Sequence, residues 1–222
     1  MPRVSRAESE AHHRAIEAAA SRLFRERGLH AVTVADVMAD VGLTHGGFYA
    51  HYPSKDALAA AACEAAFAQS ALKWQRRVGE AATKGEASRA IAEGYLRPAN
   101  ADPTTATCPT ATLVTDVARA AEGHPIQAAY VAGVRQQIET LTHLGTSGDG
   151  RGDRAAACVR LATMMGALLL ARATHGDALS AEILEATRAH LTDDIAPVRP
   201  ARRSREQKTL PRRRAGRAGG VR

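Results

Sequence analysis

Apolar side chains recur at three- and four-residue intervals through most of the chain, which predicts helices rather than strands. Between residues 9 and 27, Ile16, Ala20, Leu23 and Phe24 share one helical face, and Gly28 follows as a stop signal. Alanine is abundant whereas Val, Ile, Phe and Tyr are sparse, and this composition also favours helices. The sequence therefore predicts an all-α protein.

Two shorter helical segments follow the first. Thr33 and Asp36 have the spacing of a capping box, and apolar positions at helical spacing continue from Val34 to Val41. Gly42 then supplies a stop, and a third segment begins after it. Two short helices joined through Gly42 and packed on a longer first helix predict a helix-turn-helix unit.

The third segment has an unusual composition for a helix. It lies within the stretch THGGFYAHYPSK, from Thr44 to Lys55, which holds three of the chain's eight aromatic residues. Thr44 can cap this segment, which must finish before Pro53 because the residue preceding proline is pushed out of the helical region. Its two adjacent glycines oppose a helix by about 2 kcal/mol relative to alanine. That cost makes sense where the backbone approaches another surface closely, as a recognition helix does in a DNA major groove.

Two side-chain pairs divide the roles of this segment. Phe48 and Tyr52 lie four residues apart and are expected to face inward. His45 and Tyr49, also four apart, are expected to project from a neighbouring face and remain free to touch a partner. Ser54 then caps a long helix that continues into the high seventies.

Residues 14–67 resemble the N-terminal domain of the TetR/AcrR family of bacterial transcriptional regulators. The resemblance runs through RAIEAAASRLFRERG and TVADVMADVGLTHGGFYAHYPSKDAL and into the long helix that follows. One departure is Met38, where many relatives have a small alanine between the two helices. The resemblance implies an all-helical homodimer with a three-helix DNA-binding domain and a divergent ligand-binding domain. It implies a repressor that releases a double-stranded DNA operator when a small-molecule inducer binds. The alternative within the DNA-binding class is an activator or a nucleoid-associated protein.

The resemblance also implies which residues contact DNA. His45 and Tyr49 are expected to meet base edges or the adjoining backbone, whereas the Tyr49 hydroxyl, His51, Lys55 and the Thr33 cap are expected to anchor phosphates. The full predicted contact set is Thr33, Thr44, His45, Gly46, Gly47, Tyr49, His51 and Lys55. A two-fold dimer places its recognition helices about 34 Å apart, so the operator is expected to be an inverted repeat.

On this interpretation the chain has three parts. Residues 1–55 form a DNA-binding head, residues 56–196 a helical regulatory and dimerisation body, and residues 197–222 a basic tail. Helices of the body are expected near 86–97, 109–122, 125–144, 153–174 and 179–192. The last two carry apolar stripes that are expected to pair with their copies in a second subunit.

The body offers scattered aromatic residues and one cysteine as candidates for ligand binding. The candidates are Phe67, Trp74, Tyr95, Cys108 and Tyr130, with ordinary core packing as the alternative for each aromatic residue. Cys108 precedes Pro109 at an expected helix start, where amide dipoles favour a thiolate. The segment resembles one found before the sixth helix in a subgroup of these regulators, some of which respond to electrophiles or oxidants. Cys63 and Cys158 are expected to be packing residues.

The net charge of +7 comes from the tail. Residues 197–222 carry nine Arg and one Lys against one Glu, a balance of +9 that leaves −2 for the rest. The tail is expected to be disordered, either as a solvated terminus or as a phosphate-binding arm that adds salt-sensitive affinity. The head has seven Lys or Arg and six acidic residues. Specific binding must therefore depend on helix N-termini, uncharged donors and a few cations such as Arg3, Arg6, Arg14 and Lys55.

Other classes of protein have little support in the sequence. The alternative from another class is an enzyme with Cys108 as nucleophile, but the histidines are isolated and show no spacing that would orient a base. No HxxxH or CxxC pattern occurs, and the adjacent His12 and His13 are expected to point in different directions, so neither a metal site nor a cofactor is predicted. No apolar stretch approaches about 18 residues, and residues 1–20 do not resemble a signal peptide, so a cytoplasmic location is expected.

Overall fold

The computed structural model describes residues 5–145 and 148–193, so the basic tail lies outside the described residues. The described part is helical, which confirms the predicted all-α class. In chain order the elements are α1 (Arg6–Arg27), α2 (Val34–Asp40), the 3₁₀ helix η1 (His45–Ala50), α3 (Lys55–Glu80), α4 (Lys84–Tyr95), the 3₁₀ helix η2 (Pro98–Asn100), α5 (Pro109–Thr112), α6 (Val114–Arg119), α7 (Pro125–His143), α8 (Gly150–Ala173) and α9 (Ala178–Asp193).

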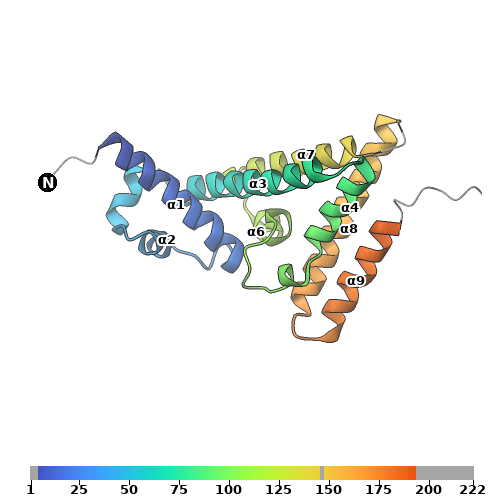
Figure 1. Cartoon of the computed structure of the whole chain (residues 1–222). Coiled ribbons are helices and arrows are strands. Elements are labelled where there is room, and N and C mark those ends of the chain that lie inside the picture. The colour runs from blue at the N-terminus through green and yellow to red at the C-terminus, as the bar shows by residue number, and fades with distance from the viewer. Residues whose placement is uncertain (1–4, 146–147, 194–222) are drawn as a thin grey trace, which may run out of the picture.

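The long helix α3 joins the two halves of the molecule. Figure 1 shows α1 and α2 grouped at the N-terminal end of α3, and α4, α8 and α9 gathered around its other end. α7 runs alongside α3, and the two are held together where the ring of Phe67 rests on Gly133. A Cβ at position 133 would collide with that ring, so glycine permits the close approach. The head and the body are therefore connected by one continuous helix.

The predicted start of α2 and the predicted stops after α1 and α2 are confirmed. The Thr33 hydroxyl accepts a hydrogen bond from the Asp36 amide at 3.1 Å, and the Asp36 carboxylate accepts one from the Thr33 amide at 2.7 Å, which completes the capping box. Gly28 and Gly42 end the two helices with φ of 86° and 70°, a region that favours glycine.

The third segment departs from the expectation in two ways. It is a 3₁₀ helix, and Thr44 precedes it without making a side-chain capping hydrogen bond. The adjacent glycines explain the tighter form, because they weaken an α-helix while a short 3₁₀ turn remains accessible. Phe48 and Tyr52 are buried with Leu23 and Phe24, as predicted.

Met38 has a specific place beneath this segment. Its side chain is buried, and its Cε lies 3.7 Å from the position that a Cβ on Gly47 would occupy. The larger residue therefore fills the space between α2 and η1 and leaves the helix-turn-helix arrangement intact.

The body differs from its predicted elements at two points. The helix expected over 109–122 is split into α5 and α6 at Leu113. α8 begins at Gly150, earlier than predicted, because the Asp149 carboxylate caps the amides of Arg151 and Gly152.

Two of the cysteines have contrasting surroundings. Cys63 is buried, and burial raises the pKa of its thiol to about 12, as expected for a packing residue. Cys158 is exposed on α8 of the described chain, so the prediction that it packs within the fold is wrong for the single subunit. Residues four apart in sequence share one face of a helix. This spacing does not show whether that face packs against the rest of the same subunit.

α8 is the one helix among the described residues that is long and apolar enough to cross a membrane by length and composition. Its most apolar window is 33% buried, and Met164, Leu168 and Ala171 lie within the core of the body. The core helix of a soluble protein meets the same criterion, so this helix alone is weak evidence for a membrane span.

Candidate nucleic-acid interface and ligand cavity

The surface of η1 presents two side chains that nothing in the described chain covers. The Tyr49 residue is 64% exposed, and His45 is exposed beside it with the two ring centroids 6.3 Å apart. The buried ring of Phe48 meets Tyr49 edge-on at 5.2 Å, so the exposed phenol stands on a fixed base. The predicted division between an inward and an outward pair is confirmed; that the outward pair contacts DNA stays a prediction.

The flanking residues of the predicted contact set already have partners inside the protein. The Thr33 hydroxyl donates to the Asp36 carboxylate at 2.6 Å, and these hydrogen bonds from Thr33 lower the pKa of Asp36. The Lys55 ammonium donates to the Leu29 carbonyl at 2.7 Å, which leaves two of its three donors for another acceptor. Lys55 is therefore held in place at the start of α3 by the first part of the loop between α1 and α2.

Three histidines gather where α1 passes behind η1. The rings of His12 and His13 lie 6.2 and 6.1 Å from the ring of His51, so both adjacent residues approach the same imidazole. His13 also stacks on Tyr52, whose hydroxyl lies 3.1 Å from the His13 Nε2. Burial, and then the neighbouring His13 and His12, lower the pKa of His51. No group of three potential ligands suited to a metal ion occurs among the described residues.

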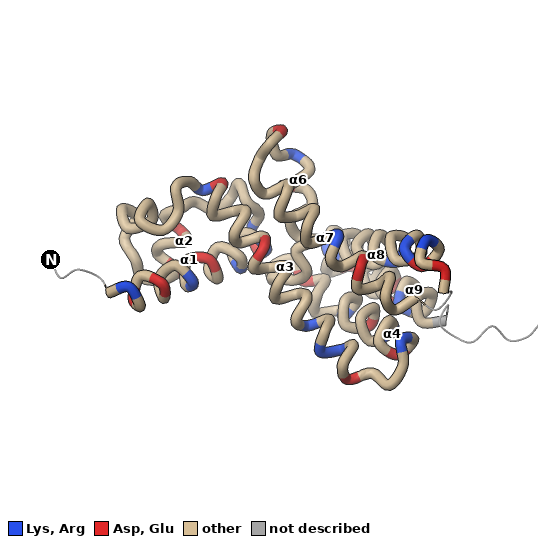
Figure 2. The backbone as a smooth tube through the Cα atoms, turned by 90° about the horizontal axis from the view of Figure 1, so that it is seen from above, with Lys and Arg blue, Asp and Glu red and all other residues tan. Residues whose placement is uncertain are grey.

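Cations are sparse on the described surface of the head. Figure 2 shows basic and acidic positions interspersed along α1, and several basic positions along the C-terminal part of α3, whereas the charged residues of α2 are acidic. Arg22 is neutralised by Glu26 at 2.9 Å and by Asp40 at 2.6 Å, and Arg25 is buried. The predicted cation Arg3 lies outside the described residues. Arg6, Arg14 and Arg27 are exposed, so the described head offers a phosphate backbone these cations and Lys55 beside its uncharged donors.

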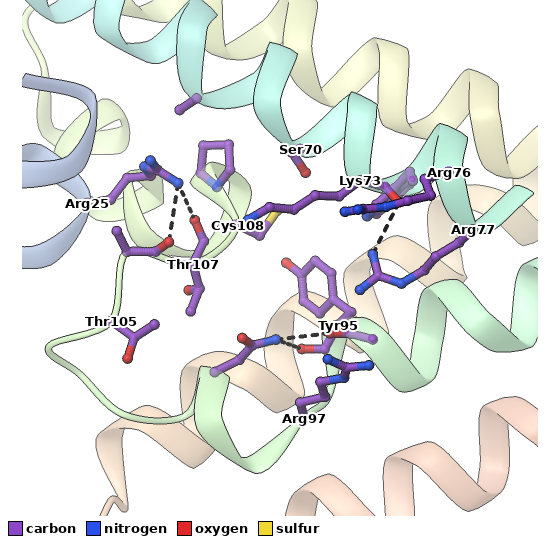
Figure 3. Close-up of a pocket in the computed structure, with 16 residues that line it drawn as sticks. Arg25, Ser70, Lys73, Arg76, Arg77, Tyr95, Arg97, Thr105, Thr107 and Cys108 are labelled. Carbon is purple, nitrogen blue, oxygen red and sulfur yellow. Dashed lines mark hydrogen bonds between the residues drawn. The ribbon is translucent and has the colours of Figure 1, made fainter. Parts of the chain in front are cut away.

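A cavity of about 340 Å³ lies in the body, between the C-terminal part of α3, the end of α4 and the loop before α5. Trp74, Tyr95 and Cys108 line it, so three of the five predicted ligand-binding residues are brought together (Figure 3). Phe67 and Tyr130 are not part of the lining. Their rings pack against each other at 5.6 Å, and the Tyr130 hydroxyl donates to the Thr110 carbonyl at 2.6 Å.

The sequence reasoning missed the residues that dominate the cavity wall. Five cationic side chains line it: Arg25, Lys73, Arg76, Arg77 and Arg97. The available signal was the i, i+3, i+4 spacing of Lys73, Arg76 and Arg77, which places three cations on one face of α3. Arg25 and Arg97 come from other elements, and only the fold brings them to the same space.

Arg25 connects α1 of the head to the rim of this cavity. Its Nη1 donates to the carbonyls of Ala106 and Thr107 at 3.3 and 3.0 Å, and its Nε donates to the Ser21 carbonyl at 2.7 Å (Figure 3). Burial lowers the pKa of this guanidinium. A second link joins the Leu29 amide to the Asp116 carboxylate at 3.1 Å. The head is thus tied to the segments on both sides of α5.

Cys108 lies at the cavity with a defined neighbour. The Gln137 side-chain amide donates to its sulfur at 3.3 Å, and the Thr110 hydroxyl donates to the Gln137 carbonyl oxygen. The helix that follows Cys108 has only four residues, so the expected support of a thiolate by a helix dipole is weak. Within the described residues, neither a histidine nor a carboxylate lines the cavity, which leaves Cys108 without the base that a nucleophilic enzyme needs.

Comparisons with known proteins agree with this architecture. Residues 16–62 match the family model described as bacterial regulatory proteins, tetR family. A helix-turn-helix-type transcriptional regulator of Bacillus subtilis, YerO, is 42% identical over 43 residues, which is 19% of this chain and 15% of that protein. The similarity to this curated relative is therefore confined to a short segment.

Solved structures resemble nearly the whole described chain. A TetR-family regulator from Agrobacterium tumefaciens is 26% identical, with a TM-score of 0.70 over 83% of this chain and 98% of its own. A TetR regulator from Chloroflexus aurantiacus is 25% identical, with a TM-score of 0.71 over 85% of this chain and 96% of its own. Both the head and the body are thus covered.

Proposed function

The chain belongs to the TetR family of transcriptional regulators, and from that premise we propose that it is a homodimeric repressor of an inverted-repeat DNA operator, released by a small-molecule inducer. A cytoplasmic location accords with this role. An activator of the same fold remains the alternative, because both would use the same DNA-binding surface. An enzyme based on Cys108 is not favoured, since the described cavity wall supplies neither a histidine nor a carboxylate as base.

The observation that carries the DNA-binding proposal is the exposed pair on η1. Tyr49 and His45 face solvent while Phe48, directly between them and the core, is fully buried. Two of the chain's few ring side chains therefore lie on a surface where the described fold does not bury them. We assign base-edge or backbone contacts to this pair, and phosphate contacts to the Tyr49 hydroxyl, His51, Lys55 and Thr33.

Gly46 and Gly47 support the same assignment through their lack of side chains. Nothing in the described chain lies within 4 Å of a Cβ placed on Gly46, so glycine is not required there by the fold. A partner surface that must come close to the backbone would account for it. Thr44, exposed and free of a capping role, completes the N-terminal end of the predicted contact set.

Apolar residues that α8 and α9 leave exposed support the dimer, in place of the predicted stripes, whose members such as Leu161, Leu168 and Leu184 are buried within the subunit. Val159 and Leu170 on α8 are 67% and 58% exposed, and Leu179 at the start of α9 is 45% exposed. A soluble subunit gains by covering large exposed apolar side chains that lie on adjacent helices. Pairing these helices with their two-fold copies would form a four-helix interface.

The cavity supports the inducer proposal because one residue belongs to both functional parts. Arg25 lies in α1 of the head, yet its guanidinium holds the backbone carbonyls of residues 106 and 107 at the cavity rim. A ligand that moves this rim changes the position of α1 directly. Cys108 at the same rim is the candidate for a response to oxidants or electrophiles.

Selection of operator DNA from a random library with the full-length purified protein tests the proposal. We expect an inverted repeat whose half-sites are one helical turn apart, protected by two subunits. The matched variants are Tyr49→Ala, which should abolish enrichment, and Leu72→Ala, an exposed apolar position on α3 outside the head, which should not. A reporter gene under the selected operator separates repression from activation. Recovery of no preferred sequence, or of a single half-site bound by one subunit, would contradict the proposal.

A further inference from the structure

We propose that the cavity beside α3 binds a small organic anion, a carboxylate or a phosphate ester, whose charge acts on Arg25. This inference rests on the proposed ligand-responsive function and names the chemistry of the ligand. It follows from the charge, the unmet hydrogen bonds and the connections of the cavity wall.

The wall is strongly cationic. It carries the five side chains Arg25, Lys73, Arg76, Arg77 and Arg97 and no carboxylate among the described residues. Figure 3 shows Lys73, Arg76 and Arg77 descending from α3, Arg97 on the opposite side and Arg25 at the edge next to the head. A ligand with a positive charge would meet only repulsion here, whereas an anion would be attracted from several directions.

These cations are not neutralised inside the described part of the protein. None of the five has a carboxylate within 4.0 Å there, in contrast to Arg22, which is paired with both Glu26 and Asp40. Burial, followed by the nearby charges of Arg97 and Arg76, lowers the pKa of Arg77. The cluster therefore repels itself, and an anion placed between its members would relieve that repulsion.

The sequence of α4 leaves room for the side chain of Arg77. A Cβ at position 94 would collide with the Arg77 guanidinium, so Gly94 of α4 provides the space in which this side chain lies. Among the described residues, the Arg77 Nη1 reaches only the Lys73 carbonyl, at 3.5 Å, which leaves most of the guanidinium donors available to a ligand. A planar guanidinium with free donors matches the two oxygens of a carboxylate or phosphate.

Tyr95 supplies an independent observation. Its residue is 4% exposed, it lines the cavity, and its hydroxyl has no hydrogen-bond partner of adequate geometry in the described structure. Burial, followed by the neighbouring Cys108 sulfur, raises the pKa of the phenol. A buried hydroxyl without a partner is unfavourable, so a ligand oxygen that accepts a hydrogen bond from the Tyr95 hydroxyl would stabilise the site.

The rest of the wall suits the organic part of such a ligand. Trp74, Ala66 and Pro109 provide apolar surface, and the volume of about 340 Å³ lies in the range of small-molecule sites. The ligand is therefore expected to be amphipathic, with its anionic group toward the arginines and an apolar group against Trp74.

Two arginines hold the loop that closes this cavity. Arg25 of the head binds the carbonyls of residues 106 and 107, and Arg172 of α8 binds the carbonyls of Asn100 and Pro103 at 3.1 and 2.7 Å. An anion in the cavity competes with neutral carbonyls for the Arg25 guanidinium, and a charged acceptor is the stronger partner. Loss of the Arg25 contacts frees α1 from a loop that is otherwise fixed to the proposed dimer helix.

Direct binding measurements on the full-length protein without DNA test the chemistry of the ligand. The compounds share a naphthyl group and differ in charge: 2-naphthoate is an anion, 2-naphthamide is neutral and 2-naphthylmethylammonium is a cation. A second anion, 2-naphthyl phosphate, is also tested. We expect both anions to bind by isothermal titration calorimetry, at least about tenfold more tightly than the amide, since hydrogen bonds to charged groups are the stronger ones. The ratio of the two anions distinguishes a carboxylate site from a phosphate site.

Variants connect the binding to the proposed residues. Arg77→Gln and Arg97→Gln are each expected to weaken the anions about tenfold and leave the amide unchanged. Arg119→Gln, an exposed arginine on α6, is the matched control and should bind like the unchanged protein. Equal binding of anion and amide, undiminished anion binding by the folded Arg77→Gln, Arg97→Gln double variant, or no anion binding at millimolar concentration would overturn the assignment.

The role of Arg25 needs the operator and is tested separately. Arg25→Lys keeps the charge but loses the fork that reaches two carbonyls and Ser21. We expect it to bind 2-naphthoate within a few-fold of the unchanged protein, while its operator affinity no longer responds to the anion. A normal operator response in this variant would remove Arg25 from the proposal. Failure of the operator selection with charge-selective binding intact would overturn the proposed function and still support the anion site.

Discussion

Phe48 and Tyr49 are neighbours in η1 with opposite surroundings, so replacing each of them separates the stability of the head from its affinity for DNA. Phe48 is 0% exposed, and removal of a buried phenyl group to alanine typically costs about 3–5 kcal/mol. Tyr49 is 64% exposed, and its ring contact with Phe48 is worth about 0.5–1.5 kcal/mol. We therefore expect Phe48→Ala to lower the free energy of unfolding several times more than Tyr49→Ala.

A third variant isolates the hydroxyl. Tyr49→Phe keeps the edge contact with Phe48 and removes only an exposed group, so its stability should stay within about 0.5 kcal/mol of the unchanged protein. If the hydroxyl anchors a phosphate, operator affinity should fall about fivefold, which corresponds to one hydrogen bond of about 1 kcal/mol. Tyr49→Ala also loses the ring and should weaken the operator at least about tenfold.

Unfolding in urea followed by circular dichroism gives the stability of each variant, and fluorescence anisotropy with labelled operator gives its affinity. Phe48→Ala should lose the most stability. Tyr49→Ala and Tyr49→Phe should lose more operator affinity for each kcal/mol of stability lost. The reasoning is refuted if Tyr49→Ala destabilises the fold as much as Phe48→Ala does. It is refuted equally if Tyr49→Ala binds the operator with unchanged affinity.

Three further changes test other parts of the molecule. Gly133→Ala should lower the free energy of unfolding in urea by about 1–3 kcal/mol, because the added methyl group meets the Phe67 ring. Gly79→Ala has open space around the new methyl group and should instead raise this free energy by about 0.5–1 kcal/mol. The lowered pKa of His51 means that the folded chain favours the neutral ring, so thermal stability should fall as the pH drops below about 6.5, and His51→Gln should flatten that fall. Replacing the arginines of residues 197–222 by glutamine should reduce the slope of operator affinity against salt; an equal slope would remove the tail from DNA binding.

The head could be predicted from sequence because its determinants are local. The Thr33–Asp36 capping box, the stop at Gly42 and the inward Phe48–Tyr52 pair each depend on residues within one turn or two of each other. The 3₁₀ form of η1 was the exception. There the backbone freedom of the glycines weakens the preference for an α-helix. The Thr44 side chain makes no capping hydrogen bond that would offset this loss.

The cavity could be predicted only in part because its wall is assembled from distant segments. Trp74, Tyr95 and Cys108 were found as rare residue types in an aliphatic body, but the same criterion also selected Phe67 and Tyr130, which pack elsewhere. Charged residues on the exposed face of an amphipathic helix and charged residues that line a cavity show the same spacing in sequence. What distinguishes them is the presence of another element opposite, and that information is tertiary.

Arg25 is the residue at which the two functional parts meet, and its burial calls for an explanation beyond stability. Burial disfavours its charged form, and its partners are neutral carbonyls and an amide rather than a carboxylate. An apolar residue of similar length could fill the same space without that desolvation penalty, so packing alone does not favour a guanidinium here. A buried cation held only by neutral acceptors is, however, ready to exchange them for a charged one. An anion arriving in the adjoining cavity provides that exchange, and the acceptors it displaces belong to the loop between the head and the proposed dimer interface.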